Sequence, residues 1–157
     1  MHGFWSFLQG LPWATAVRES PWMYPFVQLI HFSGLSLWLG TNVAVDLRLL
    51  GVGKKTQTAS ELSDELFAWN WIGFAIVVLG GFLLFSASAL MYVANPAFRI
   101  KLTMLIPLAL AWHIGVQVKT RAWGHMPDTP AVAKLAGLIE LLLWLSVVTA
   151  AVEIPTH

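Results

Sequence analysis

The sequence predicts an all-α integral membrane protein, an up-down-up-down bundle of four transmembrane helices with a short N-terminal interfacial helix. Composition is the first indication, because 57% of the 157 residues are hydrophobic and only 11% are charged, whereas soluble domains carry about 25% charged residues. The second is a series of four apolar stretches, each near the roughly 20 residues that cross a bilayer as a helix. Short connections between these stretches place neighbouring helices antiparallel. The prediction is one membrane domain, 1–157.

The bounds of the elements follow from where the apolar stretches start and stop. Residues 3–18 are apolar and aromatic but short and contain Pro12, which is typical of an interfacial helix lying along the membrane surface. Asn95-Pro96 predicts a break, because proline disfavours helical conformation in the residue before it. The apolar stretches predict spans at 23–45, 68–93, 98–118 and 131–152.

Orientation follows from the lysine and arginine residues close to the spans, which accumulate on the cytoplasmic side. The side with the two long loops carries six of them and the other side three. The six are Arg48, Lys54, Lys55, Lys119, Arg121 and Lys134, and the three are Arg18, Arg99 and Lys101. The count predicts a multi-pass protein of the bacterial inner membrane with both termini in the periplasm.

Two histidines lie in charge-free apolar stretches, His31 in YPFVQLIHFSGLSLWLG and His113 in IPLALAWHIGVQV. An ionisable side chain within a membrane span is costly and by default indicates a functional site. At 1.5 Å per residue, His31 lies about 12 Å and His113 about 22 Å from the outer boundary. Both belong to odd-numbered spans, which run in the same direction. We expect them to bind a haem iron between helices, provided that tilt or boundary error removes the offset of about 10 Å. If the offset is real, one histidine ligates the iron and the other bonds a propionate or lies at a second site.

Three glycines and two basic residues accompany the histidines. Gly34 lies one turn after His31, and Gly80 and Gly81 lie midway along the second span. These glycines would make room either for a neighbouring helix or for a porphyrin face. Arg99 and Lys101 would hold haem propionates near the outer face, or would extend to the lipid headgroups.

Glu140, within the fourth span, is the other costly group. The sequence leaves open whether it is protonated, bonds Asn42 or Gln117, or relays protons. The absence of cysteine excludes disulfides, iron–sulfur clusters and c-type haem attachment. A net charge of +1 gives no surface for nucleic acid.

Two segments resemble a family of small four-span bacterial membrane proteins of unassigned function. LIHFSGLSLWLGTNVAVDLRLLG resembles the family's first helix, a histidine helix ending in Asp-Leu-Arg-Leu-Leu-Gly. NPAFRIKLTMLIPLALAWH resembles its third span, with lysine at the start and histidine about three turns later. The resemblance covers 23–152.

The same layout is more distantly similar to HemJ-type protoporphyrinogen oxidases, which are associated with b-type haem, and to copper-resistance CopD-like proteins. In that comparison His31, Lys101 and His113 match the early histidine, the lysine and the later histidine of the HemJ type. The chain differs in having Trp112 where that family has tyrosine, and Asp46–Arg48 in place of a Pro-Arg ending.

These observations predict a haem b membrane protein that transfers electrons between a quinone or periplasmic donor and a partner protein. If the chain is an enzyme, it would be a haem-dependent oxidoreductase. His31 and His113 would be the axial ligands, since bis-histidine ligation favours electron transfer. One alternative is a non-catalytic accessory subunit of a homo-oligomer or larger membrane complex. Another is a copper-handling CopD-like protein, although copper(I) prefers softer ligands.

Overall fold

The computed structural model describes residues 2–53, 56–123 and 129–152, and in these ranges the only regular secondary structure is helical. Three helices are long and apolar enough to cross a membrane, namely Ala59–Ala87, Pro96–Trp123 and Ala131–Val152. This indicates a membrane protein. The elements are α1 (His2–Gln9), α2 (Pro12–Glu19), α3 (Met23–Leu49), α4 (Ala59–Ala87), α5 (Ala89–Ala94), α6 (Pro96–Ile100), a π-helical segment (Lys101–Leu105), α7 (Ile106–Trp123) and α8 (Ala131–Val152).

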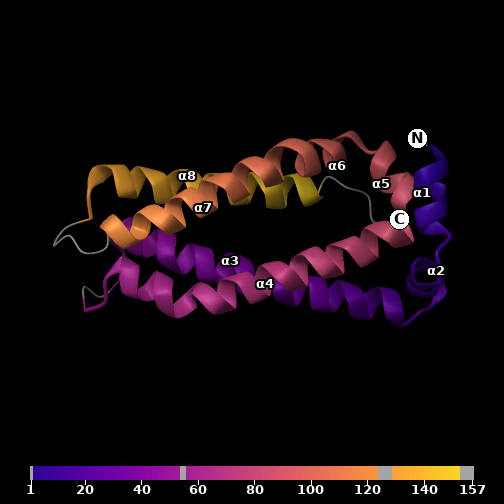
Figure 1. The fold of residues 1–157 in the computed structure, drawn as a ribbon, viewed down its shortest axis with the longest axis horizontal. Coiled ribbons are helices and arrows are strands. Elements are labelled where there is room, and N and C mark those ends of the chain that lie inside the picture. The colour runs from indigo at the N-terminus through magenta and orange to yellow at the C-terminus, as the bar shows by residue number, and fades with distance from the viewer. Residues whose placement is uncertain (1, 54–55, 124–128, 153–157) are drawn as a thin grey trace.

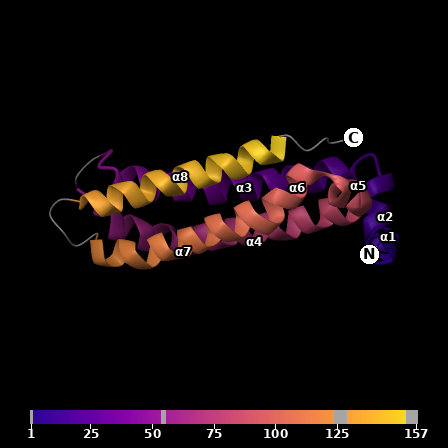
Figure 2. The same cartoon turned by 90° about the horizontal axis from the view of Figure 1, so that it is seen from above.

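The long helices α3, α4, α7 and α8 lie side by side along the length of the molecule (Figure 1). Each contacts two of the others: α3 packs against α4 and α8, and α7 packs against the same two helices (Figure 2). We call the end that holds Leu49, Ala59, Trp123 and Ala131 the loop end. The opposite end is covered by α1 and α2 and is called the covered end.

Helix α3 is longer than the expected span 23–45, and it is not among the three candidate spans because polar residues lower its hydropathy. It continues to Leu49 and ends in a glycine cap. Gly51 has a φ of +88°, Val52 N–H donates to Leu47 O at 2.9 Å, and Gly51 N–H donates to Arg48 O at 3.1 Å. This pair of bonds is a Schellman motif, so Gly51 ends the helix.

Helix α4 begins earlier and ends earlier than the expected span 68–93. A capping box starts it: Glu61 N–H donates to Thr58 Oγ1 at 3.1 Å, and Thr58 N–H donates to Glu61 Oε2 at 2.8 Å. The stretch SELSDELF, before the expected span, is therefore the first part of α4. At the other end Arg18 Nη1 donates to Ala87 O at 3.1 Å. In a continuing α-helix, Ala87 O would accept from a backbone N–H one turn later. Here the side chain of Arg18 is the donor to this carbonyl instead.

The third long helix runs from Pro96 to Trp123 and contains a π-helical turn. Asn95 Oδ1 caps its start by accepting from Phe98 N–H at 3.2 Å. Ile106 N–H donates to Lys101 O, five residues earlier, and Pro107 follows. Proline has no N–H and crowds the carbonyl four residues before it. A π turn immediately before Pro107 accommodates both effects.

The N-terminal segment, expected as one interfacial helix over 3–18, forms two short helices, α1 and α2, with Pro12 at the start of the second. They lie across the covered end (Figure 1). Two side chains attach them to α4 and α5. Arg18 donates to Ala87 O and also to Gln9 O at 3.0 Å, and Gln9 Oε1 accepts from Leu90 N–H at 3.1 Å. The segment is therefore packed on α4 and α5.

Glycines allow α3 and α4 to approach closely. A Cβ atom added to Gly73 would lie 2.7 Å from Trp38 N, and one added to Gly80 would lie 2.9 Å from His31 Cβ. On the other helix, a Cβ atom at Gly34 would lie 2.6 Å from Ile76 Cγ2. Small residues of this kind let helix backbones pack directly in membranes. The backbones of α3 and α4 are therefore in direct contact at these glycines.

We expect Gly73→Ala to destabilise the protein by about 1–3 kcal/mol, because its methyl group would overlap the backbone of Trp38. Gly40→Ala is the matched control, since a Cβ atom at Gly40 meets nothing within 4 Å. Thermal unfolding of both variants in detergent measures the difference. Equal melting temperatures for the two variants would show that α3 and α4 do not pack as described.

Candidate functional site

A buried polar cavity lies between the four long helices, in the half of the molecule nearer the loop end. Its volume is about 20 Å³, enough for about one water molecule. The last turns of α3, the first turns of α4, the second half of α7 and one residue of α8 form its wall. The lining residues are Thr41, Asn42, Val45, Asp46, Ser63, Leu66, Asn70, His113, Val116, Gln117, Thr120 and Glu140.

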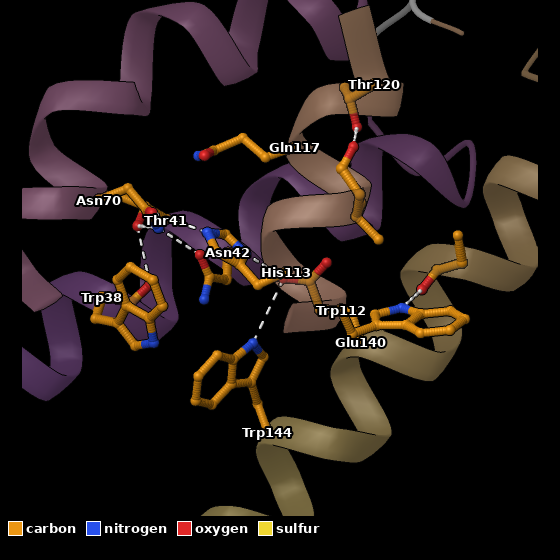
Figure 3. Close-up of polar contacts among 12 residues, drawn as sticks. Trp38, Thr41, Asn42, Asn70, Trp112, His113, Gln117, Thr120, Glu140 and Trp144 are labelled. Atoms are coloured by element: carbon orange, nitrogen blue, oxygen red, sulfur yellow. Dashed lines mark hydrogen bonds and ion pairs between the residues drawn. The ribbon is translucent and has the colours of Figure 1, made fainter. Parts of the chain in front are cut away.

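Asn70 of α4 has its amide orientation fixed by α3. Thr41 Oγ1 donates to Trp38 O at 2.9 Å, so the hydroxyl oxygen is left as an acceptor. Asn70 Nδ2 donates to that oxygen at 2.8 Å and also to Asn42 Oδ1 (Figure 3). Asn70 Oδ1 must then face α7, where it lies 3.1 Å from His113 Nε2. Since a carbonyl oxygen only accepts, Nε2 carries a hydrogen.

His113 uses both ring nitrogens in bonds to the protein. Nε2–H donates to Asn70, and Nδ1 lies 2.5 Å from Glu140 Oε1 of α8 (Figure 3). A single proton is shared between Nδ1 and Oε1, because two lone pairs at this distance would repel. His113 is 5% exposed and Glu140 is 1% exposed, so this pair is shielded from the surroundings.

Three buried polar atoms at this cavity make no hydrogen bond to the described part of the protein: Asn42 Nδ2, Asp46 Oδ2 and Glu140 Oε2. All three residues line the cavity. Buried polar atoms normally have a partner, and each exception needs an explanation. One donor and two acceptors around a space of about 20 Å³ fit a water molecule.

Aromatic rings pack against His113 and Glu140 beside the cavity. The centroids of the Trp38 and His113 rings are 4.8 Å apart, and Trp38 is 1% exposed. Trp144 packs edge-on against Trp38 at 5.5 Å, and its Nε1 lies 3.5 Å from Glu140 Oε1. Trp71 lies 6.0 Å from His113. The polar groups consequently face the loop end.

The two histidines expected to share one iron are not brought together. His113 lies beside Trp38, whereas His31 precedes Trp38 by seven residues of α3, about 10 Å along the axis. His31 Nδ1 donates to Val77 O at 3.0 Å, in the α3–α4 contact. Both nitrogens of His113 are occupied by Asn70 and Glu140. This arrangement does not fit an iron ion ligated by both histidines.

The other predicted site residues lie in the half nearer the covered end. Gly34 and Gly80 lie where α3 and α4 touch, and a Cβ atom at Gly81 would lie 3.2 Å from His31 Cε1. These contacts favour the neighbouring-helix explanation of the glycines. Lys101 lies in the π turn with Nζ 5.4 Å from the centre of the Phe98 ring, and Arg99 is exposed.

Asn70 and Asp46 line the polar cavity but were not identified from the sequence as site residues. Asn70 is a polar residue within the apolar stretch AWNWIG. A polar residue inside a span is a signal that the sequence also gave for Glu140. Asp46 looks in the sequence like a partner of Arg48, yet it is 1% exposed, and Arg48 Nε donates to Gln57 O at 2.6 Å. The sequence left three alternatives open for Glu140, and the structure adds a fourth, which is its hydrogen bond to His113. In the described ranges no three His, Asp or Glu side chains form a group suited to a metal ion.

Comparison with known proteins places the chain in a family without assigning an activity. No curated protein and no solved structure matches it. A family model described as a family of unknown function (DUF6644) matches residues 21–155, which include all four long helices and the polar cavity. The chain therefore belongs to the DUF6644 family.

Proposed function

We propose that all four long helices cross the inner membrane as an up-down-up-down bundle, with α3 as the additional span. Its 27 residues are about 40 Å long, more than the roughly 30 Å of a hydrocarbon core. Its polar residues Thr41, Asn42 and Asp46 are buried against the other helices. Its outer face carries exposed apolar side chains such as Phe26, Leu29 and Phe32, which suit contact with lipid.

In this arrangement the loop end faces the cytoplasm and both termini face the periplasm, as the distribution of Lys and Arg favours. A reporter that is active only in the cytoplasm and one active only in the periplasm, each fused after residue 157, test the orientation. We expect activity from the periplasmic reporter alone. Activity from the cytoplasmic reporter alone would reverse the orientation.

For the function, we propose that the protein binds and relays protons within the membrane, between the loop end and a redox or transport partner. The observation that carries the proposal is the gathering of His113, Glu140 and Asp46 at one cavity that contains three unpartnered buried polar atoms. Chains of Asp, Glu and His in membrane proteins typically serve as proton relays. Two carboxyl groups and one imidazole share the cavity, so at least one carboxyl group has no cationic partner there.

The depths of these groups give the relay a direction. Asp46 lies three residues from the end of α3, about 5 Å along the axis. Glu140 lies nine residues into α8 and His113 ten residues before the end of α7, both about 15 Å deep. Beyond them lie the rings of Trp38 and Trp144, which pack edge-on against each other. A proton would therefore enter from the loop end at Asp46, reach Glu140 across the cavity, and rest on the Glu140–His113 pair.

Infrared difference spectroscopy on a pH jump tests the relay. We expect a carboxylic-acid C=O band that shifts in D₂O, because protonation of a buried carboxyl group gives an isolated band. Glu140→Gln and Asp46→Asn should each remove part of this band, since glutamine and asparagine cannot titrate. Glu65→Gln is the control, because Glu65 is exposed and bonds Gln57. A difference spectrum unchanged by Glu140→Gln and Asp46→Asn would contradict the proposal.

A second candidate is haem binding through His31 alone. Because His31 Nδ1–H donates to Val77 O, its Nε2 is left as the acceptor nitrogen, which is the orientation common among metal-ligating histidines. A haem would supply one-electron chemistry, and a single histidine would leave one iron position open. Lys101, with Arg99 two residues before it, would bind a haem propionate. Such a protein would exchange electrons with a quinone or a redox partner.

An absorption spectrum and a pyridine haemochrome assay of protein expressed with added haem test this candidate. We expect His31→Ala to abolish the haem bands and His113→Ala to retain them, since His113 is committed to Asn70 and Glu140. A colourless wild-type protein would refute haem binding and leave the proton relay as the function. Loss of the bands in a folded His113→Ala protein would restore the two-histidine prediction.

The accessory-subunit prediction is compatible with a proton relay that serves a larger complex. The copper-handling prediction stays a prediction that no contact in the described residues favours.

A further inference from the structure

A second, larger hollow lies on the outer surface between α7 and α8 and is separate from the polar cavity. This groove has a volume of about 520 Å³, within the 300–1,000 Å³ of typical ligand sites. Its wall is almost entirely apolar. The residues that line it are Leu108, Ala111, Trp112, Gly115, Val116, Lys119, Trp123, Val132, Leu135, Ala136 and Ile139.

The part of the groove between Lys119 and Leu108 matches the hydrocarbon half of one leaflet of a bilayer. Along α7, Lys119 and Leu108 are eleven residues apart, about 16 Å. Half of a hydrocarbon core of roughly 30 Å is about 15 Å. Lys119 and Trp123 lie near the loop end, where a headgroup would be, and Leu108 lies near mid-membrane. The groove therefore fits an acyl chain that enters from the leaflet at the loop end.

Lys119 supplies a positive charge at the headgroup level. It is exposed, and within residues 2–53, 56–123 and 129–152 it forms no ion pair. Its neighbour Arg121 is instead paired with Asp64, with Nη2 3.2 Å from Oδ1. A lysine ammonium that is available at a membrane surface attracts an anionic lipid. Tryptophan residues prefer the same interfacial level.

Gly115 keeps the middle of the groove open. A Cβ atom at this position would meet nothing within 4 Å, so glycine is not required there for helix packing. One turn earlier, Trp112 Nε1 donates to Ala136 O at 3.1 Å and holds the indole ring between α7 and α8. A larger side chain at Gly115 would fill the groove without displacing either helix.

We infer that this groove binds one anionic phospholipid, with an acyl chain between α7 and α8 along Gly115 and the phosphate at Lys119. The inference is independent of the proton relay, because none of its polar contacts involves Glu140, His113 or Asp46.

Native mass spectrometry of the full-length protein, titrated with phosphatidylglycerol or phosphatidylcholine of identical acyl chains, tests the site. We expect the wild-type protein to retain one phosphatidylglycerol and to prefer it about fivefold over phosphatidylcholine, the usual effect of one lysine at an anionic surface. Lys119→Gln should abolish the preference while keeping one lipid bound. Gly115→Leu should abolish retention of both lipids.

Lys134→Gln is the matched control, because Lys134 is exposed near the same end of α8 but does not line the groove. It should leave the preference unchanged. Equal retention of the two lipids by the wild-type protein, or unchanged retention by Gly115→Leu, would overturn the inference. So would a dimer that Gly115→Leu converts to a monomer, because the groove would then be occupied by a second copy of the chain. Unfolding temperatures of the variants establish that each is folded.

Discussion

The side-chain amide of Asn70 is the contact on which the polar interior depends. It donates to Thr41 and Asn42 of α3 and accepts from His113 of α7, so one residue of α4 joins three helices. Because its orientation makes His113 Nε2 a donor, the remaining nitrogen must share a proton with Glu140 of α8. In an apolar environment an unpaired polar group is costly. This requirement selects one relative placement of the four helices among those that apolar packing alone allows.

Close contact between α3 and α4 makes this hydrogen bonding possible. Gly73 lies three residues after Asn70 and lets the backbone of Trp38 approach directly. Thr41 is three residues after Trp38 and therefore comes within reach of Asn70. The same close approach brings His31 against Gly80 and Gly81 in the other half. The glycines at the contact between α3 and α4 thus position both histidines, but in separate halves of the molecule.

The half nearer the loop end and the half nearer the covered end suit different chemistry. In the half nearer the loop end, titratable groups share a small cavity and bond to one another, an arrangement suited to holding and moving protons. In the half nearer the covered end, His31 bonds a backbone carbonyl and keeps Nε2 as an acceptor, an arrangement suited to a ligand. The ring of Trp38, packed on His113 and Trp144, lies between the two.

The sequence by itself determined that the protein is all-helical and has apolar helices suited to a membrane, because long apolar stretches are local properties of the chain. It also identified His31, His113 and Glu140 as costly groups, since one ionisable residue in an apolar stretch is visible without a structure. Helix ends were less predictable: Thr58, Arg18 and Gly51 set them through caps and contacts that hydropathy does not register. Only the tertiary structure decided that Glu140 pairs with His113, and that His31 lies elsewhere. Those pairings depend on how the helices are rotated and shifted against each other, which Asn70 and the glycines of α4 fix through contacts between helices.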